Sequence, residues 1–290
     1  MRNVVDNLKE MAGEIQNLLN DLLHRHSSIY LWNTPGGGLT VISAAGNYAY
    51  QKLDDEGRQV QTNLLEKYRR FNALITVLTQ GQPKDTINKA TKAHNKIINT
   101  IEQTHTWCKN TTEAFNKADQ ALQDQLSLLN HLYDHSNGEV TYVPDTNAII
   151  YNTNLEKWNF SYISKFTIVF LPTVFSELDS LKINHRNEEV RKKAEKLIRM
   201  IKEYRRRGKL TTGVEVVKGK IKVQALAIEP KMEDSLPWLD STNNDDRLLA
   251  GVIEVMRNRP RLPVVAVSRD INFQNKAEFA GIPCVEPPEI

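Results

Sequence analysis

The sequence predicts an α+β protein of two domains, with a helical bundle over residues 1–135 and an α/β domain with a mostly parallel central sheet over residues 139–290. Three observations lead to this prediction. Apolar residues of the first half recur at three- and four-residue steps, the periodicity of amphipathic helices. In the second half, short apolar runs alternate with helical patterns, as in sheets whose parallel strands are joined by helices. A short polar segment, residues 136–140, separates the two patterns.

Composition and cysteine content fit an ordinary globular protein of the cytoplasm. The 290 residues are 40% hydrophobic and 25% charged. No apolar run approaches the roughly 18–20 residues of a membrane span, and the first ten residues lack the apolar block of a signal peptide. Cys108 and Cys284 are the only cysteines and lie in different halves. Two distant thiols predict neither a disulfide framework nor a structural zinc site, which suits a reducing compartment.

Four apolar stripes predict four helices in the first half. The stripes run from Val4 to Leu22, from Leu53 to Leu78, from Ala93 to Ile101 and from Ala114 to Leu129. Gly81-Gln-Pro83 separates the second stripe from the third, because proline cannot continue a helix and glycine tolerates the turn. We expect Thr111 or Thr112 to cap the fourth helix. Helices joined by such short breaks usually pack antiparallel.

Residues 29–42 interrupt the helical pattern. Their β-rich flanks surround a Pro-Gly turn, which predicts a small hairpin or an ordered loop. The segment contains three consecutive glycines, but no Lys-Ser/Thr pair follows and the Rossmann spacing is absent. We therefore interpret the glycines as a turn and not as a phosphate-binding loop.

The second half alternates strands and helices. In chain order the sequence predicts a strand over 141–143, a buried strand over 166–171, a helix starting at Pro172, an Arg-rich helix within 182–209, a β-hairpin over 214–223 turning at Lys218-Gly219, a helix over 248–256, a strand over 262–267 and a short helix ended by Gly281. A continuous apolar strand is expected where both faces of a sheet are covered. Proline at the first helical position loses no hydrogen bond.

Four acidic residues of the second half stand at special places in this pattern: Asp145, Glu177, Asp246 and Asp270. Two follow predicted strands, and two lie at or near the starts of helices. An α/β fold gathers such positions at one edge of its sheet. Carboxylates held close together repel one another, and a divalent cation relieves this repulsion. The pattern indicates a Mg²⁺- or Mn²⁺-dependent phosphodiesterase site, although a lone Asp at a strand end is often only a helix cap.

Read in order, the strings around these acids resemble the motifs of PIN-domain nucleases. They are Asp145-Thr-Asn147, Ser176-Glu-Leu-Asp179, Asn244-Asp-Asp-Arg-Leu-Leu-Ala250 and Val267-Ser-Arg-Asp-Ile-Asn272. The last string, and the insertion of an Arg-rich helix and a hairpin, look like the larger subgroup that includes PIN domains attached to PhoH ATPases and those of eukaryotic RNA decay. The resemblance covers about residues 139–288. Residues 1–135 resemble no family that we can name.

The resemblance implies a function and a role for each matching residue. It implies an endoribonuclease that cuts single-stranded RNA with metal-activated water, leaving 5′-phosphate and 3′-hydroxyl ends. The three aspartates Asp145, Asp246 and Asp270 would hold Mg²⁺ or Mn²⁺, and Glu177 would orient water. The polar groups around them would be Thr146, Asn147, Ser268 and Asn272.

Two further acids compete with these assignments. Asp245 neighbours Asp246, and helical spacing alone does not separate them; Asp246 fits the Asp-x-x-Leu-Ala spacing of the family. Asp179 lies two positions from Glu177, nearly opposite around a helix, so the two carboxylates are not expected to face one metal ion.

A basic segment follows the Glu177 helix. Residues 182–209 contain 12 Lys/Arg and 4 Asp/Glu, whereas residues 1–140 contain 14 against 15. Phosphate backbones attract such a patch without sequence preference. The candidate RNA-binding residues are Lys192, Lys193, Lys196, Arg199, Arg205, Arg206 and Arg207. The alternative is a solvated helix face. Tyr204 and Trp238 would either stack on unpaired bases or pack in the core.

Other classes of protein fit the sequence less well. The haloacid-dehalogenase pattern requires a second Asp two residues after Asp145, where this chain has Asn147. There is no nucleophile elbow of a serine hydrolase and no Walker loop. The strongest rival is an inert PIN scaffold whose helical half serves oligomerisation or protein docking. Small PIN nucleases are often toxins restrained by partner proteins, so the helical half could equally regulate or target a nuclease, as a homo-oligomer or through a regulatory protein.

Overall fold

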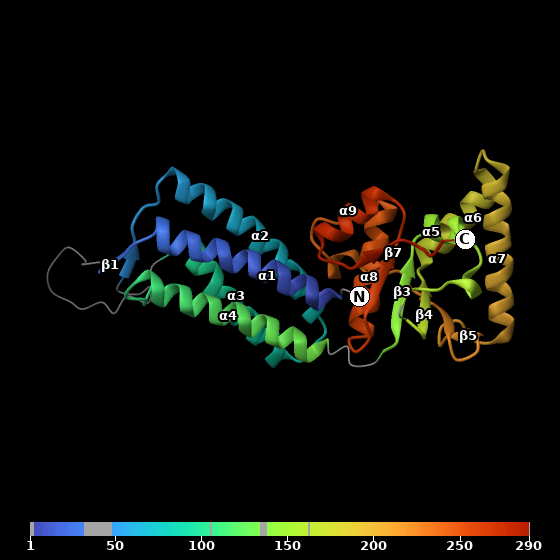
Figure 1. The fold of residues 1–290 in the computed structure, drawn as a ribbon, viewed down its shortest axis with the longest axis horizontal. Coiled ribbons are helices and arrows are strands. Elements are labelled where there is room, and N and C mark those ends of the chain that lie inside the picture. The colour runs from blue at the N-terminus through green and yellow to red at the C-terminus, as the bar shows by residue number, and fades with distance from the viewer. Residues whose placement is uncertain (1–2, 32–47, 105, 134–137, 162, 290) are drawn as a thin grey trace. The chain divides into compact units, whose positions relative to one another are not determined.

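The computed structural model describes residues 3–31, 48–104, 106–133, 138–161 and 163–289. These residues form two compact units (Figure 1). The helical unit spans Leu8–His131, and the second unit combines Leu132 onward with the beginning of the chain up to Asn7. The predicted fold class is confirmed: a helical N-terminal region precedes an α/β region with a mostly parallel sheet.

Long amphipathic helices build the helical unit, as the four stripes predict. They are α1 (Val4–Asp21), α2 (Asp55–Thr79), α3 (Lys84–Ile101) and α4 (Thr111–Leu132), with a π-helical turn η1 (Leu22–His26) after α1. Stripe residues such as Leu64, Phe71 and Leu122 are almost completely buried. Gly81 takes a positive φ of 77°, as the predicted turn requires.

The cap of α4 differs from the prediction. Thr111 begins the helix, and the backbone N–H of Glu113 donates to Oδ1 of Asn110 at 2.8 Å. Asn110 is therefore the cap, and the expectation that Thr111 or Thr112 would fill this role is wrong. Asparagine accepts from the first turn at least as well as threonine does, and it stands one position earlier.

Only the beginning of the predicted 29–42 hairpin lies in the described part of the chain. Strand β1 (Ile29–Leu31) pairs antiparallel with β2 (Tyr48–Tyr50), and Tyr48 forms a bridge with Thr106. The rest of the predicted hairpin, residues 32–42 with the three glycines, lies outside the described residues.

One sheet organises the second unit. Among the described residues its strands are ordered β5-β6-β4-β3-β7-β8. They are β3 (Val140–Pro144), β4 (Phe166–Phe170), β5 (Val214–Val217), β6 (Ile221–Ala225), β7 (Val264–Val267) and β8 (Cys284–Val285). All pairs are parallel except β5 with β6. Strands β3, β4 and β7 are buried along their whole length, and the continuous apolar run over 166–171 predicted this for β4.

Helices cover both faces of this sheet. Figure 1 shows α6 (Pro172–Asn184) and α7 (Glu188–Arg207) on one side and α8 (Asn244–Asn258) and α9 (Ile271–Phe279) on the other. The short helix α5 (Thr146–Tyr151) follows β3 directly, and two 3-10 turns, η2 (Leu155–Lys157) and η3 (Met232–Asp234), lie in connections. Pro172 occupies the start of α6 as predicted. None of the helices that the structure describes has the length and apolarity that crossing a bilayer requires.

The predicted hairpin is an extension of the main sheet. Strands β5 and β6 pair antiparallel with an irregularity between Glu215 and Val217, and Gly219 in the turn takes a positive φ of 70°. Strand β6 also pairs in parallel with β4, from Phe166 opposite Ile221 to Phe170 opposite Ala225. The carboxyl end of β6 therefore lies at the same edge of the sheet as the ends of β4, β3 and β7.

Candidate active site

The register of the sheet places Asp145 at the carboxyl edge. Strands β3 and β7 run parallel with Pro144 opposite Val267. The next residues of the two strands, Asp145 and Ser268, leave the sheet side by side. The backbone N–H of Asp145 still donates to the carbonyl of Val267 at 2.9 Å. Strand pairing, and not a loop conformation, fixes this acid.

Asp145 is a buried carboxyl with both oxygens engaged. It is 7% exposed, and it caps α5 because its Oδ1 accepts from the backbone N–H of Ala148 at 2.6 Å. Its Oδ2 accepts from the hydroxyl of Ser268. Burial raises the pKa of Asp145 to about 6; the two hydrogen bonds oppose this shift, and the charges of Glu177 and Asp270 add to it. A nearby cation would favour the charged form.

Glu177 is held on α6 by two side chains from other elements. Its Oε2 accepts from the hydroxyl of Thr146, and its Oε1 accepts from Nδ2 of Asn244 at 2.7 Å. Thr146 follows Asp145 directly, so this bond ties the two carboxylates to one region. Asp179 is exposed, in keeping with its expected place on a different side of the helix.

Ser268 links Asp145 to Asp270. Its side chain is fully buried, and its Oγ accepts from the backbone N–H of Asp270 at 2.9 Å while its hydroxyl donates to Asp145. Asp270 is half-buried and caps α9, since its Oδ1 accepts from the N–H groups of Asn272 and Phe273 at 2.7 and 3.2 Å. Two of the predicted site aspartates are thus helix caps, as the structural interpretation of an acid after a strand expects.

Asp246 and Asp245 occupy different environments at the start of α8. Asp246 is 6% exposed; its Oδ2 accepts from the N–H of Asp240 at 2.9 Å, and its Oδ1 forms an ion pair with Lys276 at 2.6 Å. Asp245 is half-buried and lies 3.8 Å from the Lys276 ammonium. Burial raises the pKa of Asp245; the charge of Lys276 opposes this, and that of Asp270 adds to it. Asp245 therefore feels the charge of Asp270, whereas both oxygens of Asp246 already have partners.

The four predicted polar groups around the acids divide into two pairs. Thr146 and Ser268 are buried and donate to Glu177 and Asp145. Asn147 and Asn272 are exposed, and in the described part of the chain neither amide side chain forms a hydrogen bond. The structure therefore brings Thr146 and Ser268 into the site and leaves the two asparagines at its surface.

A chain of polar contacts beside Glu177 was not predicted. Arg247 donates to Oε1 of Glu229 at 2.7 Å, and the buried hydroxyl of Thr173 lies 3.3 Å from the same oxygen. Arg247 also reaches Oδ1 of Asn244 at 3.5 Å, which connects this group to Glu177. Asn244 and Arg247 belong to the string that predicted the site, so their helical spacing from the acids was a usable signal. Glu229 lies in a loop and had none.

The donor atoms of the site suit a hard divalent cation, but they are not gathered into a finished cage. Among the described residues, no three acidic, histidine or cysteine side chains stand close enough to hold a metal ion. The carboxylates whose charges act on Asp145 or Asp245 are Glu177, Asp270 and Asp246. All-oxygen donors of this kind suit Mg²⁺ or Mn²⁺. To bind a metal ion, the carboxylates would have to turn oxygens that now accept hydrogen bonds from Ser268, from Thr146 and from the N-termini of helices.

Part of the predicted basic segment is internally paired. Lys192 and Lys193 form ion pairs with Glu188 and Glu189, one helical turn earlier on α7, at 2.7 and 3.1 Å. Lys196 donates to Thr153 and Asn154 at 3.1 Å in both cases. Arg207 donates to the carbonyl of Glu215 at 2.9 Å. Pairing of this kind reduces the charge these residues offer to a ligand.

Three arginines among the candidate RNA-binding residues carry exposed charge. Arg199, Arg205 and Arg206 are exposed, and within the described residues none of them forms an ion pair. Tyr204 is 1% exposed and serves as a packing residue of α7. Trp238 is 37% exposed and packs edge-on against Phe279, with ring centroids 5.3 Å apart.

Comparison with known families agrees with this geometry. A family model described as "PIN domain" matches residues 142–287, half of the chain, and the chain belongs to the PIN-domain family. Proteins of this family are generally nucleases and typically use divalent metal ions. No family model matches the N-terminal half. A comparison with curated proteins finds no match to this chain.

Proposed function

We propose that the PIN unit is a divalent-metal-dependent endoribonuclease that cuts single-stranded RNA with water as the nucleophile. The observation that carries the proposal is the position of Asp145. This carboxyl is buried, and its pKa is raised to about 6 by burial together with the charges of Glu177 and Asp270. Strongly shifted carboxyls in a group of like charges are typical of catalytic centres. Stability alone gives no reason to bury this charge.

Each side chain has a role that its contacts support. Asp145 and Asp270 would hold Mg²⁺ or Mn²⁺ together with Asp245 or Asp246 from the start of α8. A bound ion would supply charge neutralisation on the phosphate and a lowered pKa for the attacking water. Glu177, positioned by Thr146 and Asn244, would accept a hydrogen bond from that water and orient it toward phosphorus. Ser268 would set the relative positions of Asp145 and Asp270.

The test is cutting of a labelled single-stranded RNA by the full chain with Mg²⁺ or Mn²⁺. We expect products with 5′-phosphate and 3′-hydroxyl ends, because water and not the RNA 2′-hydroxyl is the nucleophile. The Asp270→Asn variant should cut at least about 100-fold more slowly and still bind RNA. Asp124→Asn in α4 is a matched acid-to-amide control that should cut like the wild type. Cutting that survives EDTA, or 2′,3′-cyclic phosphate products, would contradict the proposal.

The second candidate function is an inert PIN scaffold. It draws support from the pairing of Asp246 with Lys276, which gives one predicted ligand a permanent cation. Ion binding separates the two candidates, because a ligand that binds the folded state raises its melting temperature. An active site predicts that Mn²⁺ raises the melting temperature of the wild type and not that of Asp145→Asn. A scaffold predicts no shift in either protein.

We further propose that the helical unit restrains or targets the nuclease, through oligomerisation or a regulatory protein. Its near-neutral charge makes it a poor phosphate-binding surface of its own. The test compares the full chain with residues 132–290. Because Asn7 donates to the carbonyl of Gly281 at 3.0 Å, the full-length variant Asn7→Ala controls for the loss of this contact. Unchanged rate and selectivity in the fragment would reject the proposal.

A further inference from the structure

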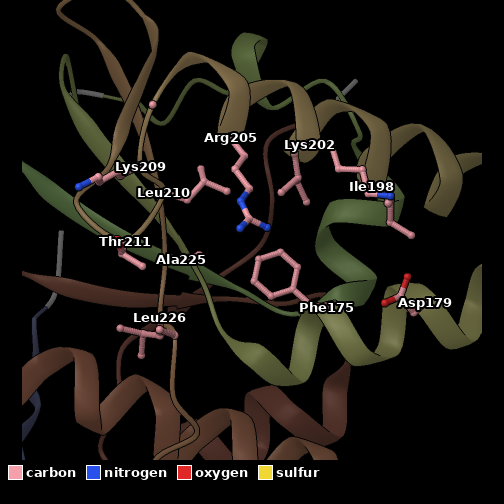
Figure 2. A pocket seen from close by; sticks show the side chains of 13 residues that line it. Phe175, Asp179, Ile198, Lys202, Arg205, Lys209, Leu210, Thr211, Ala225 and Leu226 are labelled. Carbon is pink, nitrogen blue, oxygen red and sulfur yellow. The ribbon is translucent and has the colours of Figure 1, made fainter.

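A pocket of about 670 Å³ lies between α6, α7 and the carboxyl end of β6 (Figure 2). Its lining contains none of the four candidate site acids, and of the residues predicted to bind RNA it contains only Arg205. Its size is that of pockets that hold small organic ligands. The chemistry of its lining therefore decides what it can bind.

The apolar part of the pocket is built around an aromatic ring. Phe175 on α6 is half-buried, and its ring packs at 60° against buried Phe170, with centroids 5.9 Å apart. The apolar lining also includes Ile198, Leu210 and Leu226. A half-buried ring that packs against a core residue is a rigid platform on which a flat group can stack.

The charged part is cationic. The pocket is lined by three cations, Lys202, Arg205 and Lys209, and by one acid, Asp179. All three cations are exposed, and in the described ranges of the chain none of them forms an ion pair. Figure 2 shows the Arg205 guanidinium directed toward the ring of Phe175, and Lys209 at the end of the pocket away from Asp179.

The pocket and the acidic residues lie at the same edge of the sheet. Ala225 and Leu226 line the pocket at the end of β6, and β6 is parallel to β4, which neighbours β3. Strands β6 and β3 are two strand spacings apart, which amounts to roughly 10 Å. Phe175 and Glu177 are two residues apart on α6, so their side chains project on nearly opposite sides of the helix. Both lie in its first two turns, so a nucleic-acid strand that passes over the N-terminal end of α6 can contact one on each side.

We propose that this pocket holds an unpaired base of the RNA substrate beside the nucleotide that is cut. The base would enter between the Phe175 ring and the Arg205 guanidinium, while Lys202 and Lys209 contact the neighbouring phosphates. Aromatic rings and arginine planes stack on bases of any sequence, and lysines neutralise phosphates. The inference rests on the proposed nuclease function, since it takes the acidic residues as the place of cutting.

Binding is measured separately from cutting. The full-length Asp270→Asn protein serves as a background that does not consume RNA, and anisotropy of a fluorescein-labelled oligouridylate reports affinity at several salt concentrations. We expect Arg205→Gln combined with Lys202→Gln to weaken binding about tenfold and to lower the slope of log affinity against log salt by about 1 to 2. Lys218→Gln combined with Lys220→Gln is the matched control, because these two exposed lysines precede β6 at the opposite edge of the sheet.

The stacking step has its own variant. Phe175→Leu keeps an apolar side chain and removes the ring, so we expect affinity to fall about fivefold to tenfold with an unchanged salt slope. An abasic nucleotide placed at each position of the oligonucleotide in turn should weaken wild-type binding at one position. That abasic site should cost the Phe175→Leu protein much less. Circular dichroism melting of each variant confirms that it is folded.

Three results would overturn the proposal. One is equal loss of affinity in the Arg205 and Lys202 double variant and in the Lys218 and Lys220 double variant, which indicates only diffuse attraction. Another is an unchanged affinity in Phe175→Leu. The third is binding of free uridine monophosphate as tightly as the oligonucleotide, which indicates a mononucleotide site. If the wild type cuts RNA while the pocket variants bind and cut like it, the pocket inference alone fails; if the wild type cuts nothing, the nuclease function fails whatever the binding shows.

Discussion

The two units of this chain differ in where several of their hydroxyl side chains donate. In the helical unit, the hydroxyls of Thr62, Thr76 and Thr91 donate to carbonyls four residues earlier in their own helices. In the PIN unit, the hydroxyls of Ser268 and Thr146 donate to carboxylates 123 and 31 residues away. Local bonds satisfy a side chain where it stands. The long-range bonds from Ser268 and Thr146 hold two carboxylates in fixed positions, as the proposed active site requires.

The comparison predicts that the PIN unit is destabilised by its own site. Because burial raises the pKa of Asp145 from 3.8 to about 6, the folded protein holds this proton more tightly than the unfolded chain does. Stability should therefore be lost as pH rises from about 4 to about 6, and the loss should persist at neutral pH. In chelator at pH 7, Asp145→Asn should raise the free energy of unfolding of the PIN unit by up to about 3 kcal/mol.

Hydrogen exchange followed by mass spectrometry measures this effect, since it reports on β3 and β7 separately from the helical unit. The matched control is Asp179→Asn, an exposed acid on α6 whose replacement should change exchange very little. Equal protection of β3 in the wild type and in Asp145→Asn at pH 7 would show that the buried carboxyl costs nothing.

The next largest effect on stability is expected when a buried ion pair of the PIN unit is broken, and it is compared with the loss of an exposed ion pair in the helical unit. Lys276 neutralises Asp246, which is 6% exposed, whereas Lys67 pairs with a half-exposed Glu14 at 2.6 Å in the helical unit. Removal of Lys276 leaves a buried carboxylate without its cation, so Lys276→Met should cost about 2 kcal/mol in chelator. Lys67→Met should stay within about 0.5 kcal/mol.

Urea unfolding of the two variants, with exchange to assign each transition to its unit, gives both numbers. A divalent ion should restore part of the stability lost in Lys276→Met, because it can neutralise the same acids. Similar losses of unfolding free energy in Lys276→Met and Lys67→Met would contradict the prediction, because they would mean that the burial of Asp246 adds nothing to the strength of its ion pair.

The same contrast explains what the sequence could and could not predict. Strands β3, β4 and β7 and the helix stripes were predictable, because apolar periodicity is a local property. The pairing of Lys276 with Asp246 depends on the packing of α9 beside α8, and no local pattern contains it. The positions of Asp145 and Asp270 at the carboxyl edge of the sheet were predictable from their places after strands. Their coupling through Ser268 follows only from the register of β3 with β7.

The smallest effect tests whether the helical unit has the opposite dependence on pH. His94 stacks on Tyr68 with ring centroids 5.7 Å apart, and its Nδ1 lies 3.1 Å from the tyrosine hydroxyl. Burial lowers the pKa of His94, and the charge of Glu102 opposes this shift. The unfolded chain then binds the proton more tightly, so stability should be lost as pH falls below about 6.5.

Exchange protection of α2 and α3 should therefore decrease between about pH 7 and pH 5 in the wild type and less so in His94→Gln, which cannot take up the proton. The change should be modest, because His94 is only partly buried. Since Asp145 acts on the PIN unit in the opposite direction, the two units of one chain should respond to the same change of pH with opposite signs. A loss of exchange protection in both units on acidification would contradict this prediction. It would show that Asp145 does not determine how the stability of the PIN unit depends on pH.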